Sequence, residues 1–176
     1  MIDKEIDALI REVVDFPKKG ISFKDITPLL MDKNISDKII LEFKSRIMDL
    51  DIDAVVGIES RGFLYGFLLA NKLGVPFIPI RKSGKLPGET IKYKYDLEYG
   101  SSEVEIHKDD IKKDWNVLIH DDLLATGGTA CAAAELINLS GANIAGFTFI
   151  VSLDFLNPNK KLFKYSSNVF SLVEYK

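Results

Sequence analysis

An apolar run, two adjacent carboxylates and a turn of small residues follow one another in Val117-Leu118-Ile119-His120-Asp121-Asp122-Leu123-Leu124-Ala125-Thr126-Gly127-Gly128-Thr129. The run is typical of a buried strand, and residues 130–139 behind the turn have the length and composition of a helix. The turn is therefore expected at the carboxyl edge of a sheet, where open α/β folds bind ligands. Gly127 and Gly128 allow the backbone to approach a ligand closely, and free amides of the first helical turn point at the same place. The segment predicts a binding site for a phosphate dianion.

Polar side chains of the same segment suggest further roles. Thr126 and Thr129 can donate hydroxyl hydrogen bonds to a phosphate. Asp121 and Asp122 would repel it, so we expect them to hold sugar hydroxyls or a hydrated cation. Taken alone, the turn also fits an ordinary helix start with a capping threonine and acids that favour the helix dipole. The Rossmann and Walker glycine motifs are both absent, which argues against a generic nucleotide-binding α/β protein.

Apolar runs alternate with helix-length segments on both sides of this turn. The expected strands are residues 54–58, 75–80, 117–119, 144–151 and 169–173, and the expected helices between them are residues 63–73 and 130–139. Continuous apolar strands that alternate with helices predict a parallel sheet covered on both faces. The fold class is therefore α/β.

Two amphipathic helices are predicted before the first of these strands. The first carries apolar residues at helical spacing, namely Ile6, Leu9, Ile10, Val13 and Val14. The second is marked by Ile40, Phe43, Ile47 and Leu50. Pro17 and Gly20 end the first helix, and residues 16–28 are expected to be irregular.

Residues 81–114 interrupt the alternation, because they are mostly polar and longer than a usual connection. Apolar residues occupy every second position in part of this segment, namely Ile91, Tyr93, Tyr95, Leu97 and Tyr99, and then Val104 and Ile106. A turn at residues 100–102 separates the two sets. This pattern predicts a long β-hairpin that projects from the sheet, and we expect it to act as a lid.

Composition excludes several classes of function. With 176 residues, 47% hydrophobic and 28% charged, the chain is expected to form one domain, residues 1–176. A net charge of −3 gives no general attraction for nucleic acid or an anionic membrane, so phosphate must be bound locally. The single cysteine, Cys131, suits a reducing compartment. No signal peptide or membrane-spanning stretch of about 20 apolar residues is evident, and we expect a cytoplasmic protein.

The segment 117–129 resembles the phosphoribosyl pyrophosphate (PRPP) signature of type I phosphoribosyltransferases, in the form typical of their adenine-specific branch. Four further motifs occur in the family's order. They are a base-binding segment at residues 16–28, a first pyrophosphate loop at 59–63, a basic loop at 81–88 and a catalytic lid at 97–100. The resemblance covers nearly the whole chain. It implies a five-stranded parallel sheet flanked by helices, a small N-terminal hood in residues 1–34, and a homodimer whose basic loop reaches into the partner subunit's site.

This resemblance also implies a reaction and its residues. Adenine and PRPP would give AMP and pyrophosphate, with Mg²⁺ as the cofactor. The 5′-phosphate would be bound by Ala125, Thr126, Gly127, Gly128 and Thr129, and the ribose and magnesium would be positioned by Asp121 and Asp122. Pyrophosphate would be bound by Ser60, Arg61, Arg81, Lys82 and Lys85, and adenine by Phe23, Lys24 and Leu123. The catalytic residue would be Glu98, with Tyr99 beside it on the lid.

Each side chain also has a plainer interpretation. Arg81, Lys82 and Lys85 resemble a solvated turn, Phe23 could pack against the first helix, and Glu98 could be a solvated acid like Glu103 and Glu105. Arg61 favours an anion-binding role, because a cation is poorly placed for the dipole at a helix start. Two departures from the family pattern are His120, where an aliphatic residue is expected, and Lys24, where arginine is frequent.

Two alternative functions remain open at this point. The first is another purine specificity, hypoxanthine–guanine or xanthine, which only the N-terminal segment and the lid would distinguish. The second is a PRPP-binding transcriptional regulator without catalysis. Such regulators usually add a DNA-binding extension, and the negative net charge argues against one here.

Overall fold

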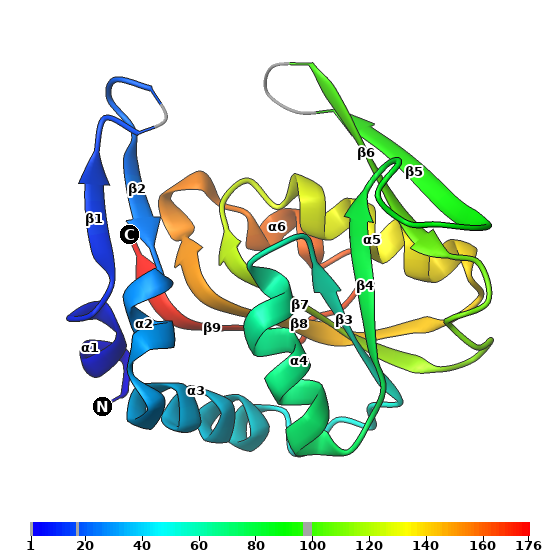
Figure 1. The fold of residues 1–176 in the computed structure, drawn as a ribbon, viewed down its shortest axis with the longest axis horizontal. Helices are drawn as coiled ribbons and strands as arrows, with labels where there is room; N and C mark the ends of the chain where they lie inside the picture. The colour runs from blue at the N-terminus through cyan, green and yellow to red at the C-terminus, as the bar shows by residue number, and fades with distance from the viewer. Residues whose placement is uncertain (1, 17, 97–99) are drawn as a thin grey trace.

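The computed structural model describes residues 2–16, 18–96 and 100–176. Within these residues the main sheet has seven strands in the order β5-β6-β4-β3-β7-β8-β9 (Figure 1). Its parallel part consists of β4 (Phe77–Lys82), β3 (Ala54–Ile58), β7 (Asn116–Leu124), β8 (Asn143–Leu153) and β9 (Val169–Tyr175). The predicted parallel sheet is confirmed. However, the strand was expected to end at the two carboxylates, whereas β7 continues through them to Leu124.

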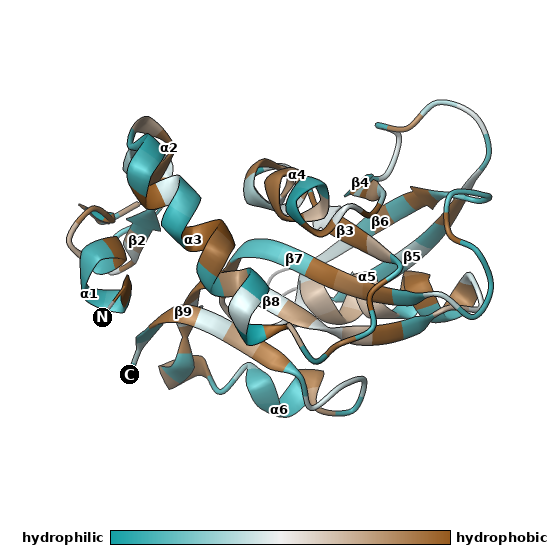
Figure 2. Ribbon diagram, turned by 90° about the horizontal axis from the view of Figure 1, so that it is seen from below, coloured by the Kyte–Doolittle hydropathy of each residue, from teal (hydrophilic) through white to brown (hydrophobic). Residues whose placement is uncertain are grey.

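Helices cover both faces of the sheet (Figure 2). On one face lie α3 (Lys33–Arg46) and α4 (Gly62–Leu73), and on the other lie α5 (Gly128–Leu139) and the short α6 (Asn159–Leu162), which follows the 3₁₀ turn η1 (Asp154–Leu156). All five residues of β3 are buried between these layers, which explains its uninterrupted apolar sequence. Among the described helices, none combines the length and apolarity needed to cross a membrane.

The strand order places a crevice between β3 and β7. The helix that follows β3 packs on one face of the sheet and the helix that follows β7 packs on the other. The loops at their carboxyl ends therefore diverge, which is where doubly wound folds bind ligands. Gly62 allows the start of α4 to approach β7, because a Cβ atom there would lie 2.8 Å from Oδ1 of Asp121. Residues 59–61 and the phosphate loop, residues 125–129, consequently face each other.

The N-terminal region differs from the prediction. The helix α1 (Ile2–Asp7) is short, and β1 (Arg11–Val14) pairs antiparallel with β2 (Ser22–Asp25) ahead of α2 (Thr27–Met31). The expectation of one helix reaching Val14, followed by an irregular segment, was therefore wrong. Val13 and Val14 are β-branched and extend readily, and their pairing partners lie on the far side of a turn.

The predicted hairpin is confirmed, with β5 (Thr90–Asp96) paired antiparallel with β6 (Ser101–His107). Ser101 and Ser102, expected in the turn, belong to β6. The hairpin also continues the main sheet, because Arg81 and Lys82 of β4 pair with β6. Its far end extends beyond the sheet (Figure 1). Residues 97–99 at that end lie outside the described part of the chain.

Candidate functional site

Two adjoining cavities open at the carboxyl ends of β3 and β7. The larger measures about 360 Å³, within the usual range for small-molecule sites, and the smaller measures about 80 Å³. Asp121, Leu123 and Thr129 line both. The larger cavity also brings in Ser60, Arg61, Lys82 and Asp122. Residues predicted from three separate motifs thus meet at one place.

The phosphate loop forms the smaller cavity, which is lined by Ala125, Thr126, Gly127, Gly128 and Thr129. Gly127 caps α5 with a left-handed backbone (φ 78°), and no side chain caps the helix. The amides of the first turn consequently remain available for an anion. A Cβ atom at Gly127 would lie 3.3 Å from the carbonyl oxygen of Pro158, so both the backbone angle and this neighbour require glycine.

Asp121 and Asp122 lie side by side at the boundary of the two cavities. The amide of Asp122 donates to Oδ1 of Asp121 at 2.9 Å, and the Asp122 side chain is only 7% exposed. Burial, and then the neighbouring Asp122 carboxylate, raise the pKa of Asp121 well above its ordinary value. Within the described residues, no three His, Cys, Asp or Glu side chains gather around a common metal position. A cation at this pair would need further oxygen ligands from a substrate or water.

Arg61 connects the predicted pyrophosphate, ribose and base positions. Its Nε donates to the Asp122 carboxylate in an ion pair. Its guanidinium carbon lies 5.4 Å from the centre of the Phe23 ring, which in turn has an edge-to-face contact with Phe16. Phe23 thus lies beside the site on β2, although α2, α3 and β3 separate it from Arg61 along the chain. The peptide bond between Glu59 and Ser60 is cis.

The side chain of Lys24 is not brought to the cavities. Its Nζ lies 3.1 Å from the carboxylate of Glu12 and 4.4 Å from the centre of the Tyr175 ring. Successive residues of a strand point to opposite faces, so Lys24 points away from the face on which Phe23 meets Arg61. Only the backbone of Lys24 remains suited to a role at the base.

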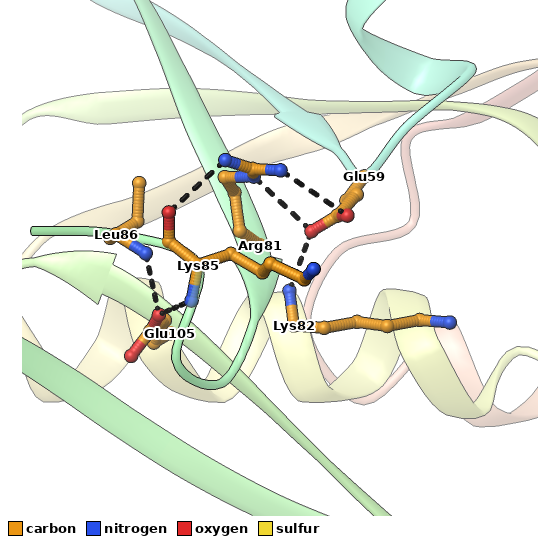
Figure 3. A network of polar contacts seen from close by, with 6 residues as sticks. All are labelled: Glu59, Arg81, Lys82, Lys85, Leu86 and Glu105. Carbon is orange, nitrogen blue, oxygen red and sulfur yellow. Dashed lines mark hydrogen bonds and ion pairs between the residues drawn. The ribbon is translucent and has the colours of Figure 1, made fainter.

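A pair of acids holds the basic loop, residues 81–88 (Figure 3). Glu59 accepts hydrogen bonds from the amide of Lys82 at 2.9 Å and from Nε of Arg81 at 3.3 Å. Arg81 also donates to the carbonyl oxygen of Lys85 at 3.1 Å. The Arg81 guanidinium is therefore engaged within the loop. Lys82 lines the larger cavity, whereas Arg81 and Lys85 are not among its described lining residues.

Glu105 is the second acid, and the prediction that it is solvated was wrong. It is 1% exposed and accepts the amides of Lys85 at 2.8 Å and Leu86 at 2.9 Å, and the hydroxyl of Thr90 at 3.2 Å. Burial raises the pKa of Glu105, but these hydrogen bonds outweigh it and hold the pKa below its ordinary value. Because side chains alternate along a strand, Glu105 points to the face of β6 opposite Val104 and Ile106, which was expected to be solvated. Nothing in the sequence near Glu105 indicated that the basic loop covers this face.

His120 and Tyr95 lie on strands next to the site, but only Tyr95 reaches a cavity. His120 is fully buried, its Nδ1 lies 3.0 Å from Oγ1 of Thr148, and its ring meets Phe43 of α3 edge-on. It therefore faces the covering helices rather than the cavities. Tyr95 lines the larger cavity, and its hydroxyl lies 3.2 Å from that of Thr129. Glu98 and Tyr99 lie outside the described residues, so their predicted roles stay predictions.

Another hollow of about 690 Å³ lies between α1, α3 and β9. Its lining is largely polar and charged, and it contains none of the residues predicted for phosphate, ribose or base. The two cavities at the crevice therefore remain the candidate site.

Comparisons with known proteins agree with this geometry. Residues 29–174 match the family model of the phosphoribosyl transferase domain. An adenine phosphoribosyltransferase from Alkaliphilus metalliredigens is 52% identical over 97% of this chain and 99% of its own. The crystal structure of adenine phosphoribosyltransferase from Thermoanaerobacter pseudethanolicus matches 99% of this chain and all of its own, with a TM-score of 0.95 at 45% identity.

A third relative was crystallised with ligands. The Saccharomyces cerevisiae adenine phosphoribosyltransferase, in complex with adenine and an iminoaltritol bisphosphate, matches with a TM-score of 0.90 at 42% identity. The match covers 97% of this chain and 98% of the yeast one.

Proposed function

Because the chain belongs to the phosphoribosyl transferase family, we propose that it transfers the phosphoribosyl group of PRPP to adenine, releasing AMP and pyrophosphate. The observation that carries the proposal is the meeting of an anion cradle, a carboxylate pair and an arginine beside an aromatic ring at one crevice. We place the reaction in the cytoplasm, whose reducing conditions suit the free Cys131.

Each part of the substrates has a suitable place in the crevice. The amides of the phosphate loop, with the hydroxyls of Thr126 and Thr129, hold the 5′-phosphate. Asp121 and Asp122 accept hydrogen bonds from the ribose hydroxyls. Ser60, Arg61 and Lys82 receive the pyrophosphate as it leaves. Fixing both reactants in this way lowers the barrier by orientation, and the placed cations stabilise charge on the leaving group.

Magnesium fits this donor set. Asp121 and Asp122 offer the hard carboxylate oxygens that Mg²⁺ prefers, and the pyrophosphate and water would complete its shell. When bound, the ion neutralises charge on the leaving group. Prolonged chelation followed by gel filtration should leave a folded protein whose activity returns with added magnesium. Loss of the fold on chelation would assign the ion a structural role instead.

Adenine specificity is expected from the backbone of the N-terminal hairpin. Adenine offers a 6-amino donor beside an unprotonated N1, whereas hypoxanthine presents the reverse pattern on that edge. Within the described residues β2 pairs only with β1, so part of its backbone hydrogen-bonding groups point away from β1. Phe23 supplies a stacking surface on the same strand, and Leu123 lines the cavity below. In this proposal residues 1–34 form the hood over the base.

The decisive experiment is a base panel with PRPP and magnesium, in which nucleotide formation from adenine, hypoxanthine, guanine and xanthine is measured by chromatography. We expect adenine to be preferred by about 10³-fold or more in kcat/KM, because a wrong base leaves buried polar groups unpaired. Comparable efficiency with hypoxanthine or guanine would favour the alternative specificities. Binding of PRPP without turnover of any base would favour a regulator.

Glu98 is proposed to accept the proton that the adenine imidazole ring loses as the glycosidic bond forms. General-base assistance typically contributes 10²- to 10⁴-fold, so Glu98→Gln should lower kcat by about 10²-fold. Glu103→Gln is the matched control, because Glu103 is a half-buried acid on the adjoining strand β6. Equal activity of the two variants would remove Glu98 from the chemistry.

We also propose a homodimer. Leu64, Phe67 and Leu68 lie on one side of α4 at helical spacing and are 42%, 56% and 43% exposed. Exposed apolar side chains on one side of the helix that follows residues 59–61 suit burial against a second copy. Phe67→Asp should shift the mass measured by light scattering from dimer to monomer, whereas Leu139→Asp, at another exposed apolar position, should not.

A further inference from the structure

Tyr95 reaches from the hairpin to the phosphate loop. It lies on β5, and its hydroxyl oxygen is 3.2 Å from Oγ1 of Thr129 at the start of α5. The ring packs nearby, because a Cβ atom built at Gly128 would lie 3.9 Å from Cδ2 of Tyr95. Tyr95 is half-buried, so this contact is partly shielded from water.

The role of this contact depends on whether Tyr95 or Thr129 donates the proton of the hydrogen bond. The Thr129 hydroxyl has one proton to donate, and it lines both cavities. If Thr129 donates to Tyr95, it turns a lone pair toward a bound phosphate dianion, which is repulsive. If Tyr95 donates instead, Thr129 keeps its proton for the phosphate. A phenol is also a better hydrogen-bond donor than an aliphatic alcohol.

From this geometry we propose that Tyr95 is a positioning residue, which donates to Thr129 and thereby directs the Thr129 proton at the 5′-phosphate. The inference rests on the proposed function, because it assumes that the phosphate loop holds that phosphate. The chain Tyr95 to Thr129 to phosphate is reinforced by polarisation along successive hydrogen bonds. By linkage, a bound phosphate also strengthens the attachment of β5 to α5.

A double-mutant cycle tests the proposal. The variants are Tyr95→Phe, Thr129→Val and the double variant, with AMP affinity measured by calorimetry. Thr129→Val removes a hydrogen bond to the charged phosphate and should weaken AMP about 10-fold, whereas Tyr95→Phe removes only the bond that orients the Thr129 hydroxyl and should weaken AMP about threefold. The double variant should be no more than about 10-fold weaker than the wild type, because both changes break the same chain. In Tyr95→Phe the KM for PRPP should rise by about the same factor as AMP affinity falls, and by more than kcat or the KM for adenine changes.

Tyr93→Phe is the matched control. Tyr93 lies two residues away on the same strand and is also half-buried, so the substitution removes the same atom at a comparable place. AMP affinity should remain within about twofold of the wild type, because substitutions away from a binding contact usually have small effects. Hydrogen exchange gives a second readout, since AMP should slow exchange of the β5 amides in the wild type but less in Tyr95→Phe.

The outcomes separate the inference from the proposed function. Wild-type affinity in Tyr95→Phe, with Thr129→Val weakened, would overturn the inference and leave the phosphate loop in place. Multiplicative losses in the double variant would also overturn it, because Tyr95 would then act independently of Thr129. Unchanged AMP affinity in both Thr129→Val and Thr126→Val would contradict the proposed phosphate site itself.

Discussion

The phosphate loop and the basic loop are both expected to bind phosphate groups, yet they are constructed differently. The phosphate loop, residues 125–129, presents backbone amides and hydroxyls, and one glycine at a left-handed backbone angle shapes it. The basic loop, residues 81–88, presents cations, and it is held by the carboxylates of Glu59, directly after β3, and Glu105 on β6. The first depends on local backbone geometry. The second depends on charges that meet only in the folded chain.

This contrast shows that a positively charged motif does not identify its ligand-binding residues. Of three cations in the basic loop, Arg81 braces the loop against Glu59, while Lys82 lines the cavity. Glu105 accepts two loop amides from the opposite side. Ionised acids thus keep the cations of this loop in place, whereas the neutral phosphate loop needs no such support.

The largest effect is expected for Gly127→Ala. A left-handed backbone costs a residue with a Cβ roughly 1–2 kcal/mol, and the new atom would also approach the Pro158 carbonyl oxygen at 3.3 Å. The phosphate loop should change its conformation to relieve this strain, and AMP affinity measured by calorimetry should fall by about 10²-fold. Gly128→Ala is the control, because its Cβ would meet only ordinary contacts of 3.8 Å or more. Similar losses in both variants would mean that backbone geometry at Gly127 is not what shapes the site.

Glu105→Gln should have the next largest effect, now on the basic loop. The glutamine oxygen can still accept both loop amides, but the NH2 group cannot accept the Thr90 hydroxyl, and the negative charge that strengthens all three hydrogen bonds is lost, at a cost of about 2 kcal/mol. Urea unfolding should show this loss, and pyrophosphate should bind more weakly while AMP affinity changes less. Glu103→Gln on the same strand should do little. Equal stability of the two variants would contradict the bracing role.

The two loops should also respond to acid in different pH windows. Burial lowers the pKa of His120, on the strand that leads into the phosphate loop, to about 3. The unfolded chain binds this proton near the ordinary pKa of 6.5, so unfolding free energy should fall as pH drops below 6.5, by about 1.4 kcal/mol at pH 5.5. Glu59 and Glu105 have lowered pKa values, so their contribution is lost only as pH falls below 4.5.

The variant His120→Leu separates the contribution of His120 from that of Glu59 and Glu105. Between pH 7.5 and 5.5 the unfolding free energy of the variant should fall by about 1.4 kcal/mol less than that of the wild type, and below pH 4.5 the variant should keep the loss that comes from Glu59 and Glu105. The slope is the relevant readout, because the variant also leaves the Thr148 hydroxyl without its imidazole partner. An unchanged slope would show that the acid sensitivity in that range arises elsewhere.

The smallest effect is expected for Lys82→Gln. Removing the exposed cation of Lys82 should weaken pyrophosphate binding by about fivefold at low salt, and the difference should shrink as salt screens the site. AMP affinity should depend less on salt, because backbone amides dominate the phosphate loop. Equal salt dependence for both ligands, measured by calorimetry, would remove the distinction between the two loops.

Much of this molecule follows from local patterns. Alternating apolar strands and helices predicted the parallel sheet, and the alternation in residues 91–106 predicted the hairpin. The turn after β7 indicated an anion site because strand end, glycines and helix start are contiguous in the chain. Its physical basis is short-range, since backbone angles and free amides depend on neighbouring residues.

The remaining features depend on residues far apart in the chain. Val13 and Val14 fitted a helix, but pairing with β2 made them a strand. Lys24 resembled a site residue, but Glu12 and Tyr175 draw its side chain away. Glu105 resembled a solvated acid until the basic loop covered it. Burial and hydrogen bonding set the free energy of a polar group, and both are decided by which distant segments pack around it.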